Sequence, residues 1–195
     1  MQRSKAMLKL CAVIALAGLG AAACAAEDAR PADDGAVVAG TWEHRQANFS
    51  YYGITALYSC SGLETNIRQL LQHLGARKDV KVNARGCPYG YDTPGHNAIV
   101  DLDFYTLSPS SGANAANTVQ ARWTPVVVNA RQPYFMGHGD CELIEEMKDI
   151  ISKNFSFRDL NYRTDCVPHE VNIDDFGIKA QTLKALPAAV GASRG

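Results

Sequence analysis

Two stretches of the chain carry apolar residues at the three- and four-residue spacing of an amphipathic α-helix. The apolar positions are Leu63, Ile67, Leu70, Leu71 and Leu74 in the first stretch, and Ile144, Met147, Ile150, Ile151 and Phe155 in the second. Such a stripe predicts a helix that packs one face on a hydrophobic core. Ser61-Gly62-Leu63-Glu64 has the pattern of a capping box at the first helix start, and Asp140 is the expected cap of the second helix.

Other stretches alternate between apolar and polar residues, which is the pattern of β-strands with one face in water. In the clearest case, Ala98, Val100, Leu102 and Phe104 share one face, and Asn97, Asp101 and Asp103 share the other. Further strands are predicted at 42–49, 80–84, 123–130 and 160–163, and a last strand-like run ends at Thr182-Leu183. Along the chain, the order strand, loop, helix, strand, strand therefore occurs twice.

The two sets of elements also share an ordered series of residues. The matched positions are Trp42 and Trp123, Cys60 and Cys141, Glu64 and Glu145, Cys87 and Cys166, Pro88 and Pro168, His96 and His169, and Thr106-Leu107 and Thr182-Leu183. We therefore predict a tandem duplication of residues 41–107 and 119–183. The expected fold class is α+β, a mainly antiparallel sheet with two helices packed on one face. Two copies indicate one domain with approximate two-fold symmetry, or two similar small domains side by side.

The N-terminal segment, 1–26, has the three parts of a secretory signal peptide. Arg3, Lys5 and Lys9 form the positive end, residues 10–19 are apolar but too short to span a bilayer, and small side chains follow up to Ala26. The sequence thus predicts an exported protein, periplasmic or secreted. An alternative is a lipoprotein in which Cys24, preceded by three alanines, carries a lipid anchor.

The remaining segments are connections. Residues 27–40 are acidic and small, residues 108–118 are polar and small, and residues 184–195 have no sustained pattern. We expect a flexible lead-in, a linker and a loose tail, respectively.

The charge balance bears on the partners. The chain has 19 basic and 20 acidic side chains; the signal peptide holds three of the basic ones, so 16 remain against 20, a net charge of −4. No basic run or stripe survives, which argues against nucleic acid as a partner. No second apolar stretch is long enough to form a transmembrane segment.

Four cysteines remain after the signal peptide is removed, and their spacing predicts a disulfide within each repeat. A strand–helix–strand crossover brings the helix start and the end of the second strand to the same edge of a sheet. The predicted bridges are Cys60–Cys87 and Cys141–Cys166, with the two crossed pairings as alternatives. The chain has no Cys-x-x-Cys pair, and its long spacings do not suit a zinc site.

One short motif points to a catalytic alternative. Cys60-Ser61-Gly62-Leu63 resembles the Cys-Ser-Gly-Leu stretch around the nucleophile of NlpC/P60-type cell-wall peptidases. The resemblance implies a cysteine peptidase in which Cys60 is the nucleophile and His96 is the base. It covers only a few residues, and Ser59 occupies the place of the aspartate that usually precedes the cysteine.

Histidines and aromatic residues mark the loop ends where a binding site is expected. His96, His138 and His169 form a shared polar or weak metal site there, or simply bind the backbone. His44 and His73 are expected to be solvated. Aromatic residues are favoured anchors at interfaces, so a recognition surface is expected at the loops before the two helices. Its aromatic candidates are Tyr51, Tyr52, Tyr134 and Phe135.

These features together favour a non-catalytic exported protein, a periplasmic or cell-envelope module that binds a protein or a small molecule. No cofactor or metal is predicted. The alternatives are a hydrolase, for example the cysteine peptidase, or an inhibitor-like protein that acts on exported enzymes.

Overall fold

The computed structural model describes residues 35–88, 90–110, 117–167 and 175–187. The predicted signal peptide (1–26) with Cys24, and the candidate His169, lie outside these residues. The described residues form an α+β fold in which six antiparallel strands make one sheet, in the order β2-β3-β1-β4-β6-β5. The elements are β1 (Val37–Tyr52), α1 (Cys60–His73), β2 (Lys81–Arg85), β3 (Asn97–Pro109), β4 (Thr118–Asn129), the single 3₁₀ turn η2 (His138–Asp140), α2 (Cys141–Asn154), β5 (Phe157–Thr164) and β6 (Phe176–Ala185).

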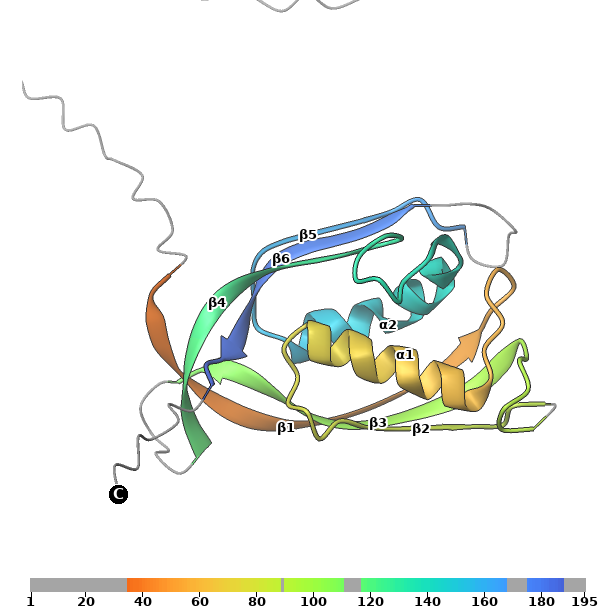
Figure 1. Cartoon of the computed structure of the whole chain (residues 1–195), viewed down its shortest axis with the longest axis horizontal. Helices are drawn as coiled ribbons and strands as arrows, with labels where there is room; N and C mark the ends of the chain where they lie inside the picture. The colour runs from red at the N-terminus through yellow and green to blue at the C-terminus, as the bar shows by residue number, and fades with distance from the viewer. Residues whose placement is uncertain (1–34, 89, 111–116, 168–174, 188–195) are drawn as a thin grey trace, which may run out of the picture. The chain divides into compact units, whose positions relative to one another are not determined.

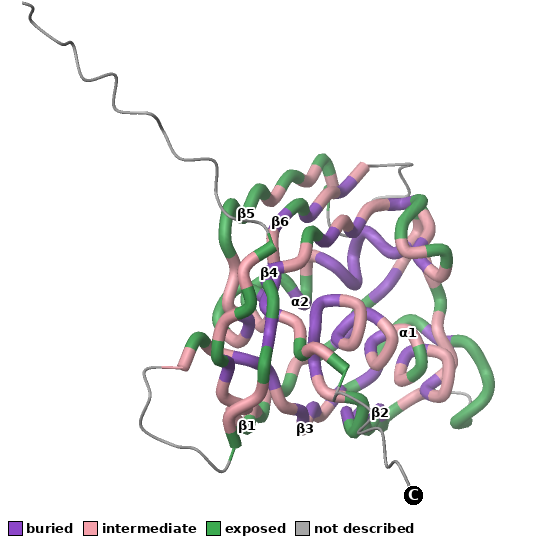
Figure 2. The backbone as a smooth tube through the Cα atoms, turned by 60° about the vertical axis from the view of Figure 1, so that its left-hand side comes forward, coloured by how far each residue is buried: buried purple, intermediate pink, exposed green. Residues whose placement is uncertain are grey.

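Both helices lie on one face of the sheet, which curves around them (Figure 1). The alternation predicted from the sequence explains this placement: the apolar positions of β3 are buried, whereas Asp101 and Asp103 lie on the outer face. The helix stripes meet the same core, and Ile67, Leu71, Ile144 and Met147 are fully buried. In contrast, most of the edge strand β5 is exposed (Figure 2).

The strand order differs from the simplest expectation in one respect. A crossover through α1 predicts that β2 lies parallel to β1, and the two strands do run in the same direction. However, β3 lies between them and pairs antiparallel with both. The inserted strand gives every strand an antiparallel neighbour and still leaves the start of α1 and the end of β2 at the same edge.

Read outward from the centre of the sheet, the two halves have the same order, β1-β3-β2 and β4-β6-β5. They meet where Val37–Thr41 of β1 pairs with Thr118–Arg122 of β4. The middle pair of this ladder, Ala39 and Gln120, has the same sequence separation as Trp42 and Trp123. This pairing makes β1 and β4 longer than the predicted strands and draws residues 37–40 of the expected lead-in into the sheet.

The helix starts also differ from expectation. The N-cap of α1 is Ser59, whose Oγ accepts a hydrogen bond from the Gly62 backbone N–H, so the predicted capping box at Ser61 is wrong. Ser61 instead donates to Asp92 over 2.7 Å. Asp140 precedes α2 as predicted, but its side chain bonds backward to Gly137 rather than to the helix.

Candidate functional site

The structure contains two disulfides, one in each half of the sheet. Cys60 bonds to Cys87 and Cys141 bonds to Cys166, with Cα–Cα distances of 6.0 and 5.9 Å. Each bridge ties the first residue of a helix to the segment just after the next strand. The predicted pairing is therefore confirmed, and both bridges lie at the end of the sheet where the helices begin.

The first disulfide involves the sulfur that the peptidase resemblance would use. A nucleophilic cysteine must be a free thiolate, but the Cys60 sulfur is bonded to Cys87 and its side chain is 2% exposed. His96 points its Nδ1 to the carbonyl oxygen of Gly53, at 2.8 Å. His96 therefore binds a backbone carbonyl, which was one of the two roles expected for it.

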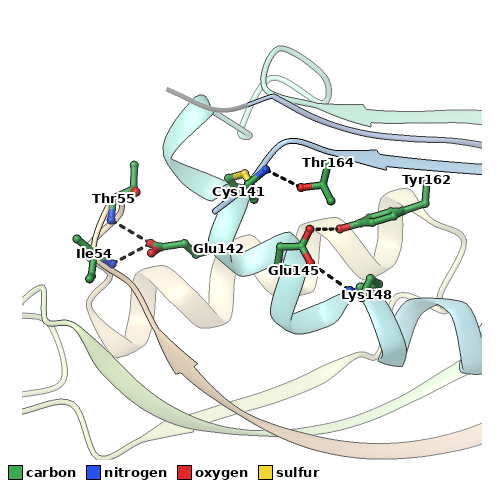
Figure 3. Close-up of a disulfide and its surroundings, with 9 residues drawn as sticks. Ile54, Thr55, Cys141, Glu142, Glu145, Lys148, Tyr162 and Thr164 are labelled. Carbon is green, nitrogen blue, oxygen red and sulfur yellow. Dashed lines mark hydrogen bonds and ion pairs between the residues drawn. A yellow bond between two sulfur atoms is a disulfide. The ribbon is translucent and has the colours of Figure 1, made fainter. Parts of the chain in front are cut away.

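The loops before the two helices meet, and a glutamate of α2 holds them together. Oε2 of Glu142 accepts hydrogen bonds from the backbone N–H groups of Ile54 and Thr55, at 2.8 and 2.9 Å (Figure 3). Glu142 is buried, so these charge-assisted bonds lie away from water and are stronger than surface contacts. We call the contact between residues 53–58 and 137–142 the loop junction.

Asp140 makes the second connection of the loop junction. Its Oδ1 accepts a hydrogen bond from the hydroxyl of Tyr58, and its Oδ2 accepts one from the Gly137 N–H at 2.6 Å. Burial raises the pKa of the Asp140 carboxyl above its usual value, with the Gly137 bond opposing the shift.

Close packing in the first loop requires a glycine. A Cβ on Gly53 would lie only 2.1 Å from the Tyr51 hydroxyl oxygen, so any side chain there would displace that hydroxyl. The same hydroxyl donates to the Ala56 carbonyl over 2.6 Å. Burial raises the pKa of Tyr51, and the nearby carboxylates of Glu142, Asp140 and Glu146 raise it further. Tyr51 is thus a core residue rather than a surface anchor.

The other aromatic candidates divide between surface and core. Tyr134 is 90% exposed and Tyr52 is 48% exposed, and the Tyr52 ring lies 6.3 Å from the His96 ring. Phe135 is partly buried against the core. The exposed Leu57 belongs to the loop junction itself. The exposed residues in and around the loops before the helices and before β3 include Tyr52, Leu57, His96 and Tyr134, and we call these four the aromatic platform.

The histidines do not form a shared cluster within the described structure. His138 is exposed and lines a hollow on the outer face of β4, β6 and β5. Among the described residues, no three His, Cys, Asp or Glu side chains are grouped as metal ligands. His73, expected to be solvated, is half-buried with Nε2 3.0 Å from the Val127 carbonyl oxygen, and burial lowers its pKa.

Glu64 of α1 and Glu145 of α2, which occupy corresponding positions, have similar structural roles. Glu64 accepts from the Ala84 N–H and the Tyr91 hydroxyl, which ties α1 to β2 and the following loop. Glu145 accepts from the Tyr162 hydroxyl over 2.6 Å, which ties α2 to β5 (Figure 3). Burial alone would raise the pKa of Glu145, but bonds from Tyr162, Thr164 and Lys148 outweigh it and lower the pKa.

Two arginines that were not predicted from the sequence lie over aromatic rings in corresponding places, Arg77 over Tyr105 near Trp42 and Arg158 over Trp123. The Arg77 guanidinium lies 3.7 Å from the Tyr105 ring centroid and 5.8 Å from that of Trp42. The Arg158 guanidinium lies 4.2 Å from the ring of Trp123. Arg77 and Arg158 have the same sequence separation as the two tryptophans and as Cys60 and Cys141. Aligning the two repeats on the Trp and Cys positions would therefore have matched these arginines.

Comparisons with protein-family models, with curated proteins and with solved structures found no match to this chain. In the part of the chain that the structure describes, no helix is long and apolar enough to cross a membrane. The two disulfides fit an extracellular or periplasmic protein, because such compartments are oxidising.

Proposed function

We propose that this protein is an exported, non-catalytic binding module that recognises a protein partner through its aromatic platform. The observation that carries the proposal is the loop junction, in which Glu142 and Asp140 hold the two helix-preceding loops together. A loop that is already fixed loses little entropy on binding, so a preorganised surface binds more tightly than a mobile one.

The chemistry of the platform favours a protein partner. Tyr52 and Tyr134 are large, exposed and amphipathic, and Leu57 is a further exposed apolar residue of the first loop. Aromatic residues are enriched at protein interfaces and often dominate their binding energy. The disulfides anchor both helix starts, which supports a scaffold role for the cysteines.

Export is part of the proposal. The order of charged, apolar and small residues in 1–26 predicts a signal peptide, and disulfides form where secreted proteins fold. The site of action would then be the periplasm or the extracellular space.

We infer further that the two halves arose by tandem duplication. One constant sequence separation relates the tryptophans, the first cysteines, the helix glutamates and the stacked arginines. It also relates Ala39 to Gln120 at the middle of the β1–β4 ladder, which is the pairing expected at a two-fold axis between equivalent strands. Sequence and register therefore support the same correspondence.

Site-specific photo-crosslinking tests the binding proposal. A photoreactive phenylalanine analogue is placed at Tyr134 or Tyr52, and at the exposed Gln120 near the other end of β4 as a control. Irradiation in the exported fraction of the source organism is expected to give one discrete protein adduct from both platform positions and none from Gln120.

A point variant makes the crosslinking test quantitative, because the adduct yield can be compared with that of the unchanged platform. Tyr134→Ser is expected to lower the adduct yield from the Tyr52 position without changing thermal stability, since Tyr134 is 90% exposed. Absence of an adduct from both platform positions, or the same adduct from Gln120, would show that the platform is not the binding surface.

A further inference from the structure

The outer face of the second half of the sheet contains a hollow lined in part by Gly177, which we call the Gly177 hollow. In this part of the sheet, Asn129 of β4, Gly177 of β6 and Arg163 of β5 lie side by side across three strands. A Cβ built on Gly177 meets no atom within 4 Å, so the missing side chain leaves the floor of the hollow open. The cavity has a volume of about 540 Å³.

The lining of the hollow is strongly basic for a chain with an overall net charge of −1. Arg131, Arg163 and Lys179 face it, with Asp175 as the one acidic residue among the described lining residues. Arg163 is paired with Asp175 at 2.8 Å. Within the described residues, Arg131 and Lys179 have no ion-pair partner.

The equivalent face of the first half shows that the fold does not require this arrangement. There, Asp101 and Asp103 of β3 lie opposite Asn48 and Gln46 of β1 in the sheet register. These two aspartates occupy the sheet positions that Gly177 and Lys179 occupy in the second half. Asp101 is paired with Arg85, and Asp103 contacts His44 at 3.1 Å. The first half is therefore charge-balanced at these positions, whereas the described residues of the second half leave an open floor and carry more positive than negative charge.

We infer that the Gly177 hollow binds a small organic anion that carries two or more carboxylate or phosphate groups. Arginine presents its N–H groups as a planar fork that matches both kinds of oxyanion, and Lys179 adds a point charge. The Oδ1 of Asn129 already accepts the Arg131 N–H at 2.8 Å, which leaves its amide NH₂ as a donor. Because exposed single ion pairs contribute little, several anionic groups are needed for useful affinity.

This inference does not rest on the aromatic platform. The hollow lies on the outer face of the strands and is built from β4, β5 and β6, together with the segment that leads into η2. Failure of the crosslinking experiment would leave the anion site untouched, and loss of anion binding would leave the protein-binding proposal intact.

Titration of the mature protein with citrate and with pyrophosphate tests the inference, with acetate at matched ionic strength as the single-charge control. Amide NMR shifts of Gly177 and Asn129 report on the site. We expect saturable binding of citrate, of pyrophosphate or of both, and no saturation with acetate. The two polyanions distinguish a carboxylate ligand from a phosphate ligand.

Three variants locate the binding. Gly177→Leu fills the hollow without changing the charge, and Lys179→Gln removes a cation without filling it; each is expected to weaken binding at least about tenfold, or about 1.4 kcal/mol. Lys81→Gln removes a cation from the equivalent outer face and is expected to leave binding unchanged. Lys179→Gln retains the test if Gly177→Leu does not fold. Binding of neither polyanion, or equal affinity in Lys179→Gln and Lys81→Gln, would overturn the inference.

Discussion

Glu142 and Asp140 are two residues apart, yet they hold different parts of the opposing loop. Glu142 accepts two backbone N–H groups, whereas Asp140 accepts the Tyr58 hydroxyl and a backbone N–H of its own segment. Both side chains are buried, so the loss of one carboxylate leaves donors without partners in a region with little water.

Replacement of Glu142 by glutamine tests the first contact. Both bonds go to the same oxygen, Oε2, and an amide oxygen accepts them without the negative charge that strengthens them, so we expect unfolding stability to fall by roughly 1–3 kcal/mol. Urea unfolding measures the loss, and hydrogen exchange should accelerate at the Ile54 and Thr55 amides. Asp149→Asn, which removes an exposed ion pair with Lys153, is the matched control and should change neither.

Asp140 should give the protein a distinct pH dependence. Because burial raises the pKa of its carboxyl in the folded state, the folded protein binds more protons than the unfolded chain above the ordinary value of 3.8. The stability linked to this proton is complete below that value and is lost as pH rises through the folded pKa.

Comparison with Asp140→Asn isolates this contribution, because asparagine does not titrate. The stability of the wild type relative to the variant should fall as pH is raised from about 3 to about 7 in urea unfolding series. A difference that is constant or increases over this range would show that Asp140 titrates at or below its ordinary pKa.

At the scale of elements, each helix ends against a strand from the other half. Oγ1 of Thr182 in β6 donates to the Leu74 carbonyl at the end of α1, over 2.6 Å. Oγ1 of Thr106 in β3 donates to the Asn154 carbonyl at the end of α2, over 2.8 Å. Helix ends leave carbonyls without intrahelical partners, and the two threonines satisfy them reciprocally.

The reciprocal arrangement predicts similar energies for the two contacts. Thr182→Val and Thr106→Val keep the shape of each buried side chain and remove its hydroxyl, so each should cost roughly 1–2 kcal/mol. Denaturant unfolding measures both losses, with Thr124→Val in the same sheet as the control. A large loss from one variant alone would argue that the halves are not energetically equivalent.

The helices were predictable from sequence because their apolar stripes span several turns. The position of β3 between β1 and β2 was not, since alternation shows which face of a strand is buried but not which strand lies beside it. The cap of α1 was misassigned because both Ser59 and Ser61 fit a capping pattern, and only the positions of Gly62 and Asp92 decide between them.

The same limit explains what could be predicted of the sites. The sequence predicts a recognition surface on the loops before the helices, and in the structure those loops contact each other. Tyr51 was assigned to that surface because the predicted strand ends at Phe49, before its alternation puts Tyr51 on the inner face. Arg131, Arg163 and Lys179 come from separate segments, so only the strand register reveals them as a cluster.

For the whole molecule, two stapled halves share one sheet and place both helix starts at the same end. The loop junction and the two disulfides lie there, which makes the cysteines part of the scaffold rather than of a reaction centre. The alternative reaction, peptide hydrolysis by Cys60, needs a free thiolate at that position.

The scaffold role of the cysteines is therefore best tested by thiol counting and disulfide mapping of the purified protein. The denatured, unreduced chain should contain no free thiol, and mass spectrometry should find the peptides of Cys60 and Cys87 joined, and those of Cys141 and Cys166 joined. A free Cys60, or a bridge between the two halves, would contradict the scaffold, and a free Cys60 would also favour the cysteine peptidase over the binding module.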